Sequence, residues 1–287
     1  MIFRLDPCGI FCICLTYLAV GYADYVFINW LVIPTMNGSL WCVFNVVAFN
    51  ALLFMLMFAH IRAMLSDPGI VPLSKTRIDF SDLRSGRNGT KTNQRNASDS
   101  DSDGSRSGQV GDDWSVCGRC ESYRPPRAHH CRVCNRCIRK MDHHCPWINN
   151  CVGEFNQKYF MQFLIYTGLA SVYSLVIIIL SWMSPCDDCK REDIKHTRVL
   201  HSIFLTVECV LFCLFVVAVS CDQFQAVLND ETAVEQVQRH GPYRLNYSKY
   251  KLLREVCGGG PFILWMFPCH GAQTARDFIQ YPSHYPV

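Results

Sequence analysis

The sequence predicts an all-α polytopic membrane protein with four transmembrane helices and a cytosolic cysteine-rich module between the second and third helices. Of the 287 residues, 50% are hydrophobic, and they are concentrated in long blocks. A transmembrane helix needs about 20 consecutive, mainly apolar residues. Four blocks reach this length, at residues 10–33, 40–59, 159–183 and 200–221. Seven cysteines lie in the polar stretch between the second and third blocks, from Cys117 to Cys151.

These blocks divide the chain into five parts. Residues 84–113 contain almost no apolar side chains, a composition that cannot form a core and therefore predicts disorder. The stretch after the fourth block has moderate hydrophobicity, enough for one or two helices on the membrane face. The expected parts are transmembrane helices 1 and 2 (1–66), a partly disordered cytosolic linker (67–113), the cysteine-rich zinc domain (114–158), transmembrane helices 3 and 4 (159–221) and a cytosolic tail (222–287).

The distribution of basic residues predicts the orientation in the membrane. Lys and Arg beside a transmembrane helix favour the cytosolic side. The segment 67–158 is rich in both, the loop 34–39 has neither, and the loop 184–199 mixes basic with acidic residues. Both termini and the cysteine-rich module are therefore expected in the cytosol. The first block is too long for a removable signal peptide and is expected to remain as a signal anchor. The net charge is only +3, and no nucleic-acid partner is expected.

Two carboxylic acids, Asp24 and Glu208, fall inside the predicted transmembrane helices. A charge in the membrane is costly, and such residues usually face the bundle interior or a water-lined cavity. Each carboxyl therefore has either a functional role or the simpler role of ordering the bundle by hydrogen bonding, and the sequence leaves both open.

The cysteine-rich segment is typical of metal binding. In a reducing compartment, clustered cysteines favour metal sites over disulfides. Cys117 with Cys120, and Cys131 with Cys134, each form a Cys-x-x-Cys knuckle that can direct two thiolates at one ion. Tetrahedral zinc then needs two further nitrogen or sulfur ligands. The sequence therefore predicts two structural Zn²⁺ ions.

Counting the ligands predicts that one cysteine stays free. The segment supplies seven cysteines and four histidines, at His129, His130, His143 and His144. Two closed sites of three cysteines and one histidine would leave one cysteine and two histidines. An unligated cysteine beside a histidine is the pattern of a base-activated nucleophile, and a carboxylate can orient that base. The run 142–145 (Asp-His-His-Cys) is the best place for this group, although spacing alone does not decide which cysteine is free.

With this run in view, the sequence resembles the DHHC family of protein S-acyltransferases, which is named for the tetrad at 142–145. The resemblance extends over nearly the whole chain. It includes Asp-Pro-Gly at 67–69, Asn-Cys-Val-Gly at 150–153, Asn-Gln-Lys-Tyr-Phe at 156–160 and Thr-Ala-Val-Glu at 232–235. Within the family the chain is most similar to the short Golgi-type members, which implies a multi-pass protein of the Golgi or another endomembrane.

The resemblance implies a role for each residue of the cluster. Cys145 would be the nucleophile, His143 the base and Asp142 its orienting partner. Thr232 and Glu235 match the family's tail motif, which contacts the active-site region. One zinc would be bound by Cys117, Cys120, His130 and Cys137, and the other by Cys131, Cys134, His144 and Cys151.

The tail departs from the family in one place. The family often carries Asn-x-x-x-Val-Phe-Gly, whereas residues 252–258 here read Leu-Leu-Arg-Glu-Val-Cys-Gly. The packing of the tail is therefore expected to differ, with the catalytic module intact.

The implied function is protein S-acyl transfer. Cys145 would accept a fatty acyl group, typically palmitoyl, from acyl-CoA and pass it to cysteine thiols of cytosolic or membrane-associated proteins near the bilayer. Four residues could meet the phosphates of CoA through charge-assisted contacts, or equally form a solvated basic face: Arg124, Arg127, His129 and Lys140. Gly168 and Ala170 either leave room for the acyl chain or allow close helix packing.

Two alternatives from other classes remain at this stage. A membrane-tethered zinc module for protein interactions would use Cys145 only as a further ligand, and it would form no acyl adduct. A cation transporter would depend on Asp24 and Glu208 and be indifferent to Cys145. The acyltransferase is favoured because the resemblance covers the whole pattern.

Overall fold

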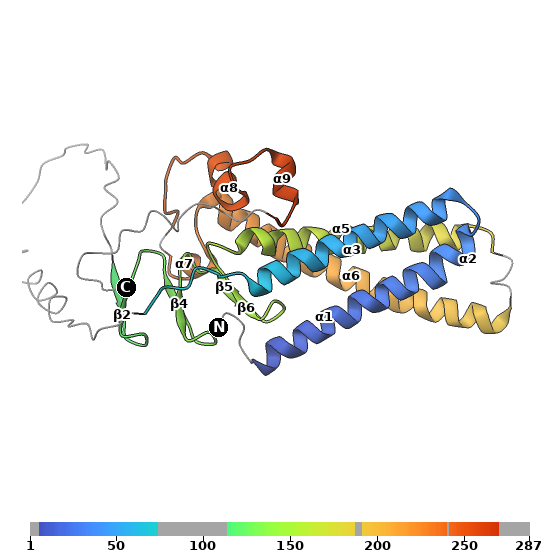
Figure 1. The fold of residues 1–287 in the computed structure, drawn as a ribbon, viewed down its shortest axis with the longest axis horizontal. Helices are drawn as coiled ribbons and strands as arrows, with labels where there is room; N and C mark the ends of the chain where they lie inside the picture. Colours follow the sequence, from blue (N-terminus) through green and yellow to red (C-terminus); the bar gives the residue numbers. More distant parts are fainter. Residues whose placement is uncertain (1–5, 74–113, 187–190, 240, 270–287) are drawn as a thin grey trace, which may run out of the picture.

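The computed structural model describes residues 6–73, 114–186, 191–239 and 241–269 (Figure 1). Four helices in these ranges are long and apolar enough to cross a membrane. The first, Pro7–Met36, consists of α1 (Pro7–Val26), a π-helical turn η1 (Phe27–Val32) and α2 (Ile33–Met36). The others are α3 (Leu40–Leu65), α5 (Gln157–Met183) and α6 (Glu192–Asn229). The predicted fold class is therefore confirmed, with two Cys/His clusters between the second and third long helices. The linker stretch 84–113 lies outside the described residues.

The fourth helix is longer than its apolar block. Hydropathy predicts a span at 200–221, but α6 begins at Glu192 and ends at Asn229. A hydropathy pattern locates the apolar part of a helix and does not detect polar turns that continue it. The helix ends where Asp230 adopts a left-handed conformation, with φ of 50°. The extra turns at this end carry Gln223, Ala226 and Val227, which are all buried.

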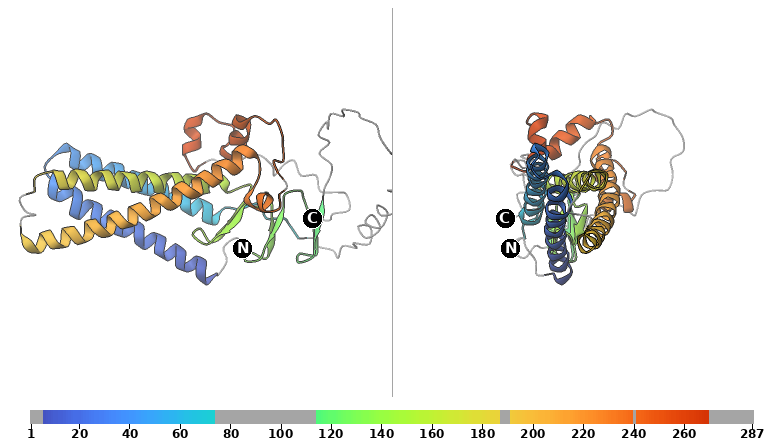
Figure 2. Two further views of the ribbon diagram at one scale, coloured as in Figure 1. Left: turned by 180° about the vertical axis from the view of Figure 1, so that it is seen from behind. Right: turned by 90° about the vertical axis from the view of Figure 1, so that its right-hand side faces the viewer.

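Helix α5 is the centre of the bundle. It lies between α3 and α6 (Figures 1 and 2). Half of the residues in its most apolar stretch are buried, the largest share among the four long helices. In the interior the rings of Phe27 and Phe49 stack with centroids 3.9 Å apart, beside Tyr173 of α5. The core of the molecule therefore runs along α5 and ends at the cysteine-rich module.

The module is built from short β-hairpins, which the sequence interpretation did not anticipate. The three antiparallel pairs are β1 (Ser115–Cys117) with β2 (Ser122–Arg124), β3 (His129–Cys131) with β4 (Arg136–Ile138), and β5 (His143–Cys145) with β6 (Asn150–Val152). An isolated two-stranded hairpin is at best marginally stable in water. Strands this short therefore need the support of cross-links between hairpins and of the helix bundle.

Asparagine side chains attach the module to α3. The last carbonyls of a helix have no partner within the helix. The Asn150 amide donates to the carbonyls of Ala63, Met64 and Ser66 at 3.0 to 3.2 Å, and so satisfies this end of α3. Backbone approach is equally close, because a Cβ added to Gly153 would lie 2.4 Å from the Pro68 carbonyl oxygen. The module is therefore fixed directly to the end of a membrane helix.

The described part of the tail forms three short helices rather than the one or two expected. They are α7 (Ala233–Val237), α8 (Lys249–Cys257) and α9 (Phe262–Met266). In α8, Leu252 and Val256 are buried against Met161 of α5 and Val227 of α6. Side chains of α5 also bind α9, since Gln162 donates to the Trp265 carbonyl at 2.7 Å. The stretch in which the sequence departs from the family therefore forms a helix docked on the bundle (Figure 1).

We expect Leu252→Ala to loosen the tail. Leu252 is 4% exposed, and removing a buried leucine side chain typically costs about 2 to 5 kcal/mol. Limited proteolysis of the protein in detergent should cut the tail of this variant faster than that of the wild type. Leu245→Ala is the matched control because Leu245 is 77% exposed. Equal cleavage rates in the two variants would contradict the docking of α8.

Candidate active site

Strand alternation separates the two histidines of the run 142–145. Successive side chains of a strand point to opposite faces, so His143 and Cys145 share one face of β5 while His144 points to the other. His144 contacts the sulfurs of the second Cys/His cluster. His143 instead faces Asp142 and Cys145. One three-residue strand therefore supplies both a metal-type ligand and a reactive pair.

Asp142 is held by three hydrogen bonds. His143 Nδ1 donates to Oδ2 at 2.7 Å, and Gln223 Nε2 of α6 donates to the same oxygen at 2.7 Å. The backbone N–H of Ala233, in the first turn of α7, donates to Oδ1 at 2.8 Å. The carboxylate is 4% exposed. Asp142 therefore joins the histidine to a membrane helix and to the tail.

The pair Asp142 and His143 has complementary pKa shifts. Burial raises the pKa of Asp142, but the hydrogen bonds from His143, the Ala233 N–H and Gln223 outweigh burial and hold that pKa below its usual range. Burial lowers the pKa of His143, but the Asp142 carboxylate and the Cys145 thiolate outweigh it and raise the pKa to about 9. Both interactions favour an imidazolium beside a carboxylate. An imidazole in this setting readily accepts a thiol proton.

The tail motif at 232–235 forms a capping box. The Thr232 hydroxyl accepts from the Glu235 N–H, and Glu235 Oε2 accepts from the Thr232 N–H at 2.7 Å. This geometry fixes the first turn of α7 and so directs the Ala233 N–H at Asp142. The motif therefore contacts Asp142 through the backbone of Ala233. Thr232 and Glu235, the two residues expected from the family resemblance, hold this backbone in place.

Arg127 links the first turn of α7 to the module through ion pairs. Its guanidinium donates to Glu235 at 2.6 and 2.8 Å and to Asp230 at 2.7 Å. The two carboxylates are 7% and 1% exposed. Burial raises the pKa of each acid, but their contacts with Arg127, and for Asp230 also with Arg244, lower both pKa values overall. Arg127 is therefore committed to an ion-pair network within the protein.

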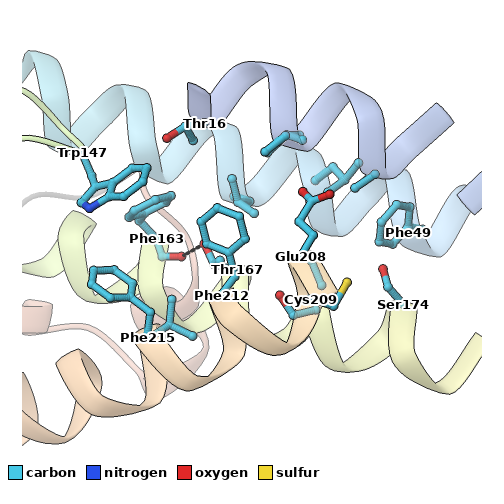
Figure 3. Close-up of a pocket in the computed structure, with 18 residues that line it drawn as sticks. Thr16, Phe49, Trp147, Phe163, Thr167, Ser174, Glu208, Cys209, Phe212 and Phe215 are labelled. Carbon is cyan, nitrogen blue, oxygen red and sulfur yellow. Dashed lines mark hydrogen bonds between the residues drawn. The ribbon is translucent and has the colours of Figure 1, made fainter. Parts of the chain in front are cut away.

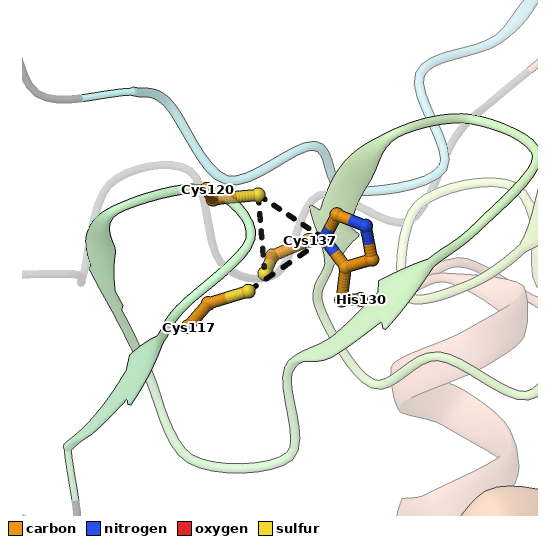
Figure 4. A group of neighbouring side chains, drawn as sticks. All are labelled: Cys117, Cys120, His130 and Cys137. Carbon is orange, nitrogen blue, oxygen red and sulfur yellow. Dashed lines mark hydrogen bonds between the residues drawn. The ribbon is translucent and has the colours of Figure 1, made fainter.

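The first Cys/His cluster links two hairpins (Figure 4). Cys117 and Cys120 come from the β1–β2 hairpin, and His130 and Cys137 come from β3 and β4. His130 Nδ1 lies 3.6 Å from the sulfur of Cys117 and 3.2 Å from that of Cys120. The sulfurs of Cys120 and Cys137 are 3.8 Å apart. A tetrahedral zinc with bonds of about 2.1 to 2.3 Å separates its ligands by about 3.5 to 3.8 Å, so the cluster fits such an ion.

The second cluster has the same chemistry and links the next pair of hairpins. Its members are Cys131, Cys134, His144 and Cys151. His144 Nδ1 lies 3.5 to 3.7 Å from the three sulfurs. Because His130 and Cys131 are neighbours on β3, alternation sends one side chain to each cluster. The two clusters contain the eight residues expected as ligands, and Cys145 belongs to neither.

An apolar pocket extends from Trp147 of the module into the helix bundle (Figure 3). Trp147, two residues beyond Cys145, lines it together with Phe163, Phe212 and Phe215, and all four long helices contribute. The lining is mainly aromatic and aliphatic. The pocket therefore presents apolar surface from Trp147 of the module into the bundle.

Of the two small residues expected in this pocket, only Ala170 lines it. Gly168 is absent from the lining and faces α6, where an added Cβ would lie 3.4 Å from Val216 Cγ2. This position favours the simpler of the two sequence interpretations for Gly168, which is close helix packing.

The four expected CoA residues do not form one group. Arg124 and His129 line a shallow pocket of the module with Arg119 and Arg132. Arg127 is occupied by Asp230 and Glu235, as described above. Lys140 lies in a separate pocket beside Glu154, Arg244 and Glu255, and its amine is 3.6 Å from Asp230. Acidic residues of the tail therefore pair with two of the four basic residues.

Sequence reasoning missed two residues that position the site. Gln223 holds Asp142, but it lies two residues beyond the apolar block in which the fourth span was predicted. His60 of α3 contacts the Trp147 carbonyl at 3.0 Å. His60 directly follows the apolar block at 40–59, so the hydropathy pattern does not single it out.

Fold and site together define the class of protein. It is a multi-pass membrane protein in which two metal-type clusters hold an Asp, His and Cys group next to Trp147, which lines an apolar pocket of the helix bundle.

Comparison with known proteins identifies the family. The model of the DHHC palmitoyltransferase family matches residues 111–240. "Palmitoyltransferase ZDHHC7" of Mus musculus is 35% identical over 278 residues, which cover 96% of this chain and 82% of the relative. "Palmitoyltransferase ZDHHC3" of Homo sapiens is 36% identical, with coverage of 93% and 83%. "Probable protein S-acyltransferase 12" of Arabidopsis thaliana is 29% identical, with coverage of 97% and 95%.

The chain therefore belongs to the DHHC palmitoyltransferase family. It is an enzyme of protein S-acylation, with acyl-CoA and protein thiols as its substrates. Family membership favours the enzyme over the two alternatives, the interaction module and the transporter.

We expect Arg127→Ala to destabilise the protein strongly. The substitution leaves Asp230 and Glu235 buried without their main partner, and breaking a buried pair typically costs about 3 to 5 kcal/mol. Arg127→Lys should recover only part of this loss, because an ammonium group cannot reproduce the two-pronged contact with Glu235. Thermal unfolding in detergent micelles is the measurement. The exposed Arg132 provides the control variant, Arg132→Ala, and equal melting temperatures for the two alanine variants would refute this role of the Arg127 ion pairs.

Proposed function

We propose that Cys145 carries the acyl group between the two substrates. His143 takes the proton of the Cys145 thiol, and Asp142 stabilises the resulting imidazolium. The Cys145 thiolate attacks the carbonyl carbon of acyl-CoA, the bond from that carbon to the CoA sulfur breaks, and the proton on His143 leaves with CoA. His143 then takes the proton of a substrate thiol, and the resulting thiolate attacks the carbonyl carbon of the acyl-enzyme. The bond from that carbon to the Cys145 sulfur breaks, and the proton on His143 returns to Cys145. The observation that carries this proposal is the shared face of His143 and Cys145 on β5, next to the buried Asp142.

The two clusters are proposed to hold structural zinc. Both have three sulfurs and one imidazole nitrogen, which is a donor set that suits zinc and leaves no open position. Structural zinc in such a site supplies folding energy. Ions in these sites would join the three hairpins, while Asp142, His143 and Cys145 carry out the proton transfers.

The acyl chain is proposed to enter the pocket below Cys145. Each methylene gains roughly 0.8 kcal/mol when it leaves water, and the pocket is lined mainly by apolar side chains. The CoA head would remain on the module side. Arg124 and His129, with Arg119 and Arg132, offer a basic surface for its phosphates, and the other two expected residues, Arg127 and Lys140, act within the tail network.

The cellular setting is also a proposal. The basic bias of segment 67–158 supports a cytosolic zinc domain and cytosolic termini. Substrates would then be cytosolic and membrane-associated proteins with cysteines close to the bilayer. Similarity to the short Golgi-type members supports a Golgi or endomembrane location, and we expect no nucleic-acid partner. We also propose that the chain is organised in the five parts 1–66, 67–113, 114–158, 159–221 and 222–287.

Incubation of the purified protein with labelled palmitoyl-CoA tests this function. We expect a label that hydroxylamine removes, as for a thioester, and that peptide mass spectrometry assigns to Cys145. A label that survives in Cys145→Ala at the wild-type level would exclude Cys145 as the acyl carrier.

Cys145→Ser and Cys134→Ser should separate chemistry from metal binding. Cys145 lies outside both clusters, whereas Cys134 belongs to the second. We expect Cys145→Ser to keep both zinc ions and the fold while acyl transfer is abolished. Cys134→Ser should lower the zinc content and the melting temperature. Metal analysis by mass spectrometry is the measurement, and zinc loss in Cys145→Ser would overturn the assignment of roles.

Two glycosylation sequons report the orientation in the membrane. Asn88-Gly-Thr and Asn96-Ala-Ser belong to the linker, outside the described residues. Because this linker is proposed to be cytosolic, both asparagines should remain unmodified in cells. A sequon introduced between α5 and α6, a connection that the same topology places in the lumen, provides the positive control. A glycosidase-sensitive mass shift mapped to Asn88 or Asn96 would invert the topology.

A further inference from the structure

The chemistry of the pocket changes along its length. At the module end its walls are the rings of Trp147, Phe163 and Phe215. Farther into the bundle, the carboxyl of Glu208 on α6 points into the space (Figure 3). Phe49 and Ser174 lie beyond Glu208, so the pocket continues past the carboxyl. A carboxyl group therefore stands in the path of a hydrocarbon chain.

Glu208 differs from the other carboxyl in the bundle. Asp24 receives a hydrogen bond from the Asn50 amide at 3.2 Å, and it is not part of the pocket lining. Within the described residues, no hydrogen bond or ion pair to the Glu208 carboxyl is present. The simpler role left open by the sequence, a carboxyl that orders the bundle by hydrogen bonding, therefore suits Asp24 and does not suit Glu208.

The depth of Glu208 matches the length of a long acyl chain. Gln223 marks the level of the reactive group on α6, because it is bonded to Asp142. At a rise of about 1.5 Å per residue, Glu208 lies about 22 Å farther along the helix. Carbon–carbon bonds of about 1.5 Å at angles of about 111° advance an extended chain by about 1.25 Å per bond. Chains of sixteen and eighteen carbons then reach about 19 and 21 Å, and a chain of twenty carbons reaches about 24 Å.

We propose that Glu208 sets the upper limit of acyl-chain length through its polarity. Methylenes that end before Glu208 are buried against apolar walls, which is favourable. Methylenes that pass Glu208 would cover an unpartnered carboxyl and deprive it of water, which is unfavourable. Chains of up to about eighteen carbons are accepted, and longer chains are rejected although the pocket extends farther. This inference rests on the proposed function, in which the acyl chain of Cys145 occupies this pocket.

Competition among acyl-CoA donors tests the inference. The full-length protein is loaded with equimolar mixtures of sixteen- and twenty-carbon acyl-CoA, and the ratio of adducts on Cys145 is read by mass spectrometry. Glu208→Leu keeps a similar volume and removes the polarity, so we expect the ratio of the long to the short adduct to rise about tenfold, equivalent to about 1.4 kcal/mol. Glu208→Gln keeps a polar group and should stay within about twofold of the wild type.

Two results would overturn the proposal. One is a rise in Glu208→Leu that Glu208→Gln reproduces, since polarity is then not the cause. The other is an unchanged ratio in Glu208→Leu. Asp24→Leu is the matched control, because it removes a membrane carboxyl that lies outside the pocket. Absence of any adduct on Cys145 in the wild type would instead refute the proposed function, so the two failures are distinguishable.

A second measurement needs only the wild-type protein. Eighteen-carbon acyl-CoA with a photoreactive diazirine at the terminal carbon is loaded onto Cys145 and irradiated. We expect crosslinks at Glu208 or its neighbours at this depth, Ser174 and Cys209. Crosslinks confined to the module end, at Trp147 and Phe215, would contradict the proposed depth and with it the role of Glu208.

Discussion

The buried carboxylate of Asp142 is the point on which the site depends. It lies in the module, yet its hydrogen bonds come from β5, from α6 and from the first turn of α7. A buried carboxylate is tolerated only when its oxygens are satisfied, so these three elements must meet for the site to be stable. The tail and His143 therefore bind the same carboxylate, so docking of the tail also helps to orient His143. Arg127 and the capping box do not touch the reactive thiol. They stabilise α7, which in turn holds Asp142.

The hairpins of the module show how a small amount of secondary structure supports this arrangement. Each of the six strands has three residues, which is too little to form a stable sheet in water. The clusters join neighbouring hairpins, and Asn150 joins the last hairpin to α3. Alternation along β3 sends His130 and Cys131 to different clusters, and alternation along β5 separates His144, in the second cluster, from His143 and Cys145. Cys145 lies outside both clusters because of its position on β5, and the number of available ligands is consistent with this.

Much of this could be predicted from the sequence, for identifiable reasons. The four long helices follow from apolar blocks, and the clusters follow from the spacing of cysteines and histidines, because both are local patterns. The contacts between distant segments were not predictable in this way. Gln223 lies outside an apolar block, and the acidic partners of Arg127 and Lys140 are about a hundred residues away in the tail. A basic residue near a proposed CoA site gives no sign of its partner until the fold is known.

We propose that Asp142, held by the tail, makes His143 an effective base for Cys145. Single-turnover loading of Cys145 by palmitoyl-CoA in Asp142→Asn measures this most directly, because the substitution keeps the shape of the side chain and removes its charge. The account predicts that the loading rate falls by at least about 100-fold, the usual contribution of a positioned acid or base, while both zinc ions are retained. A loading rate within about twofold of the wild type, with the metal content intact, would contradict it.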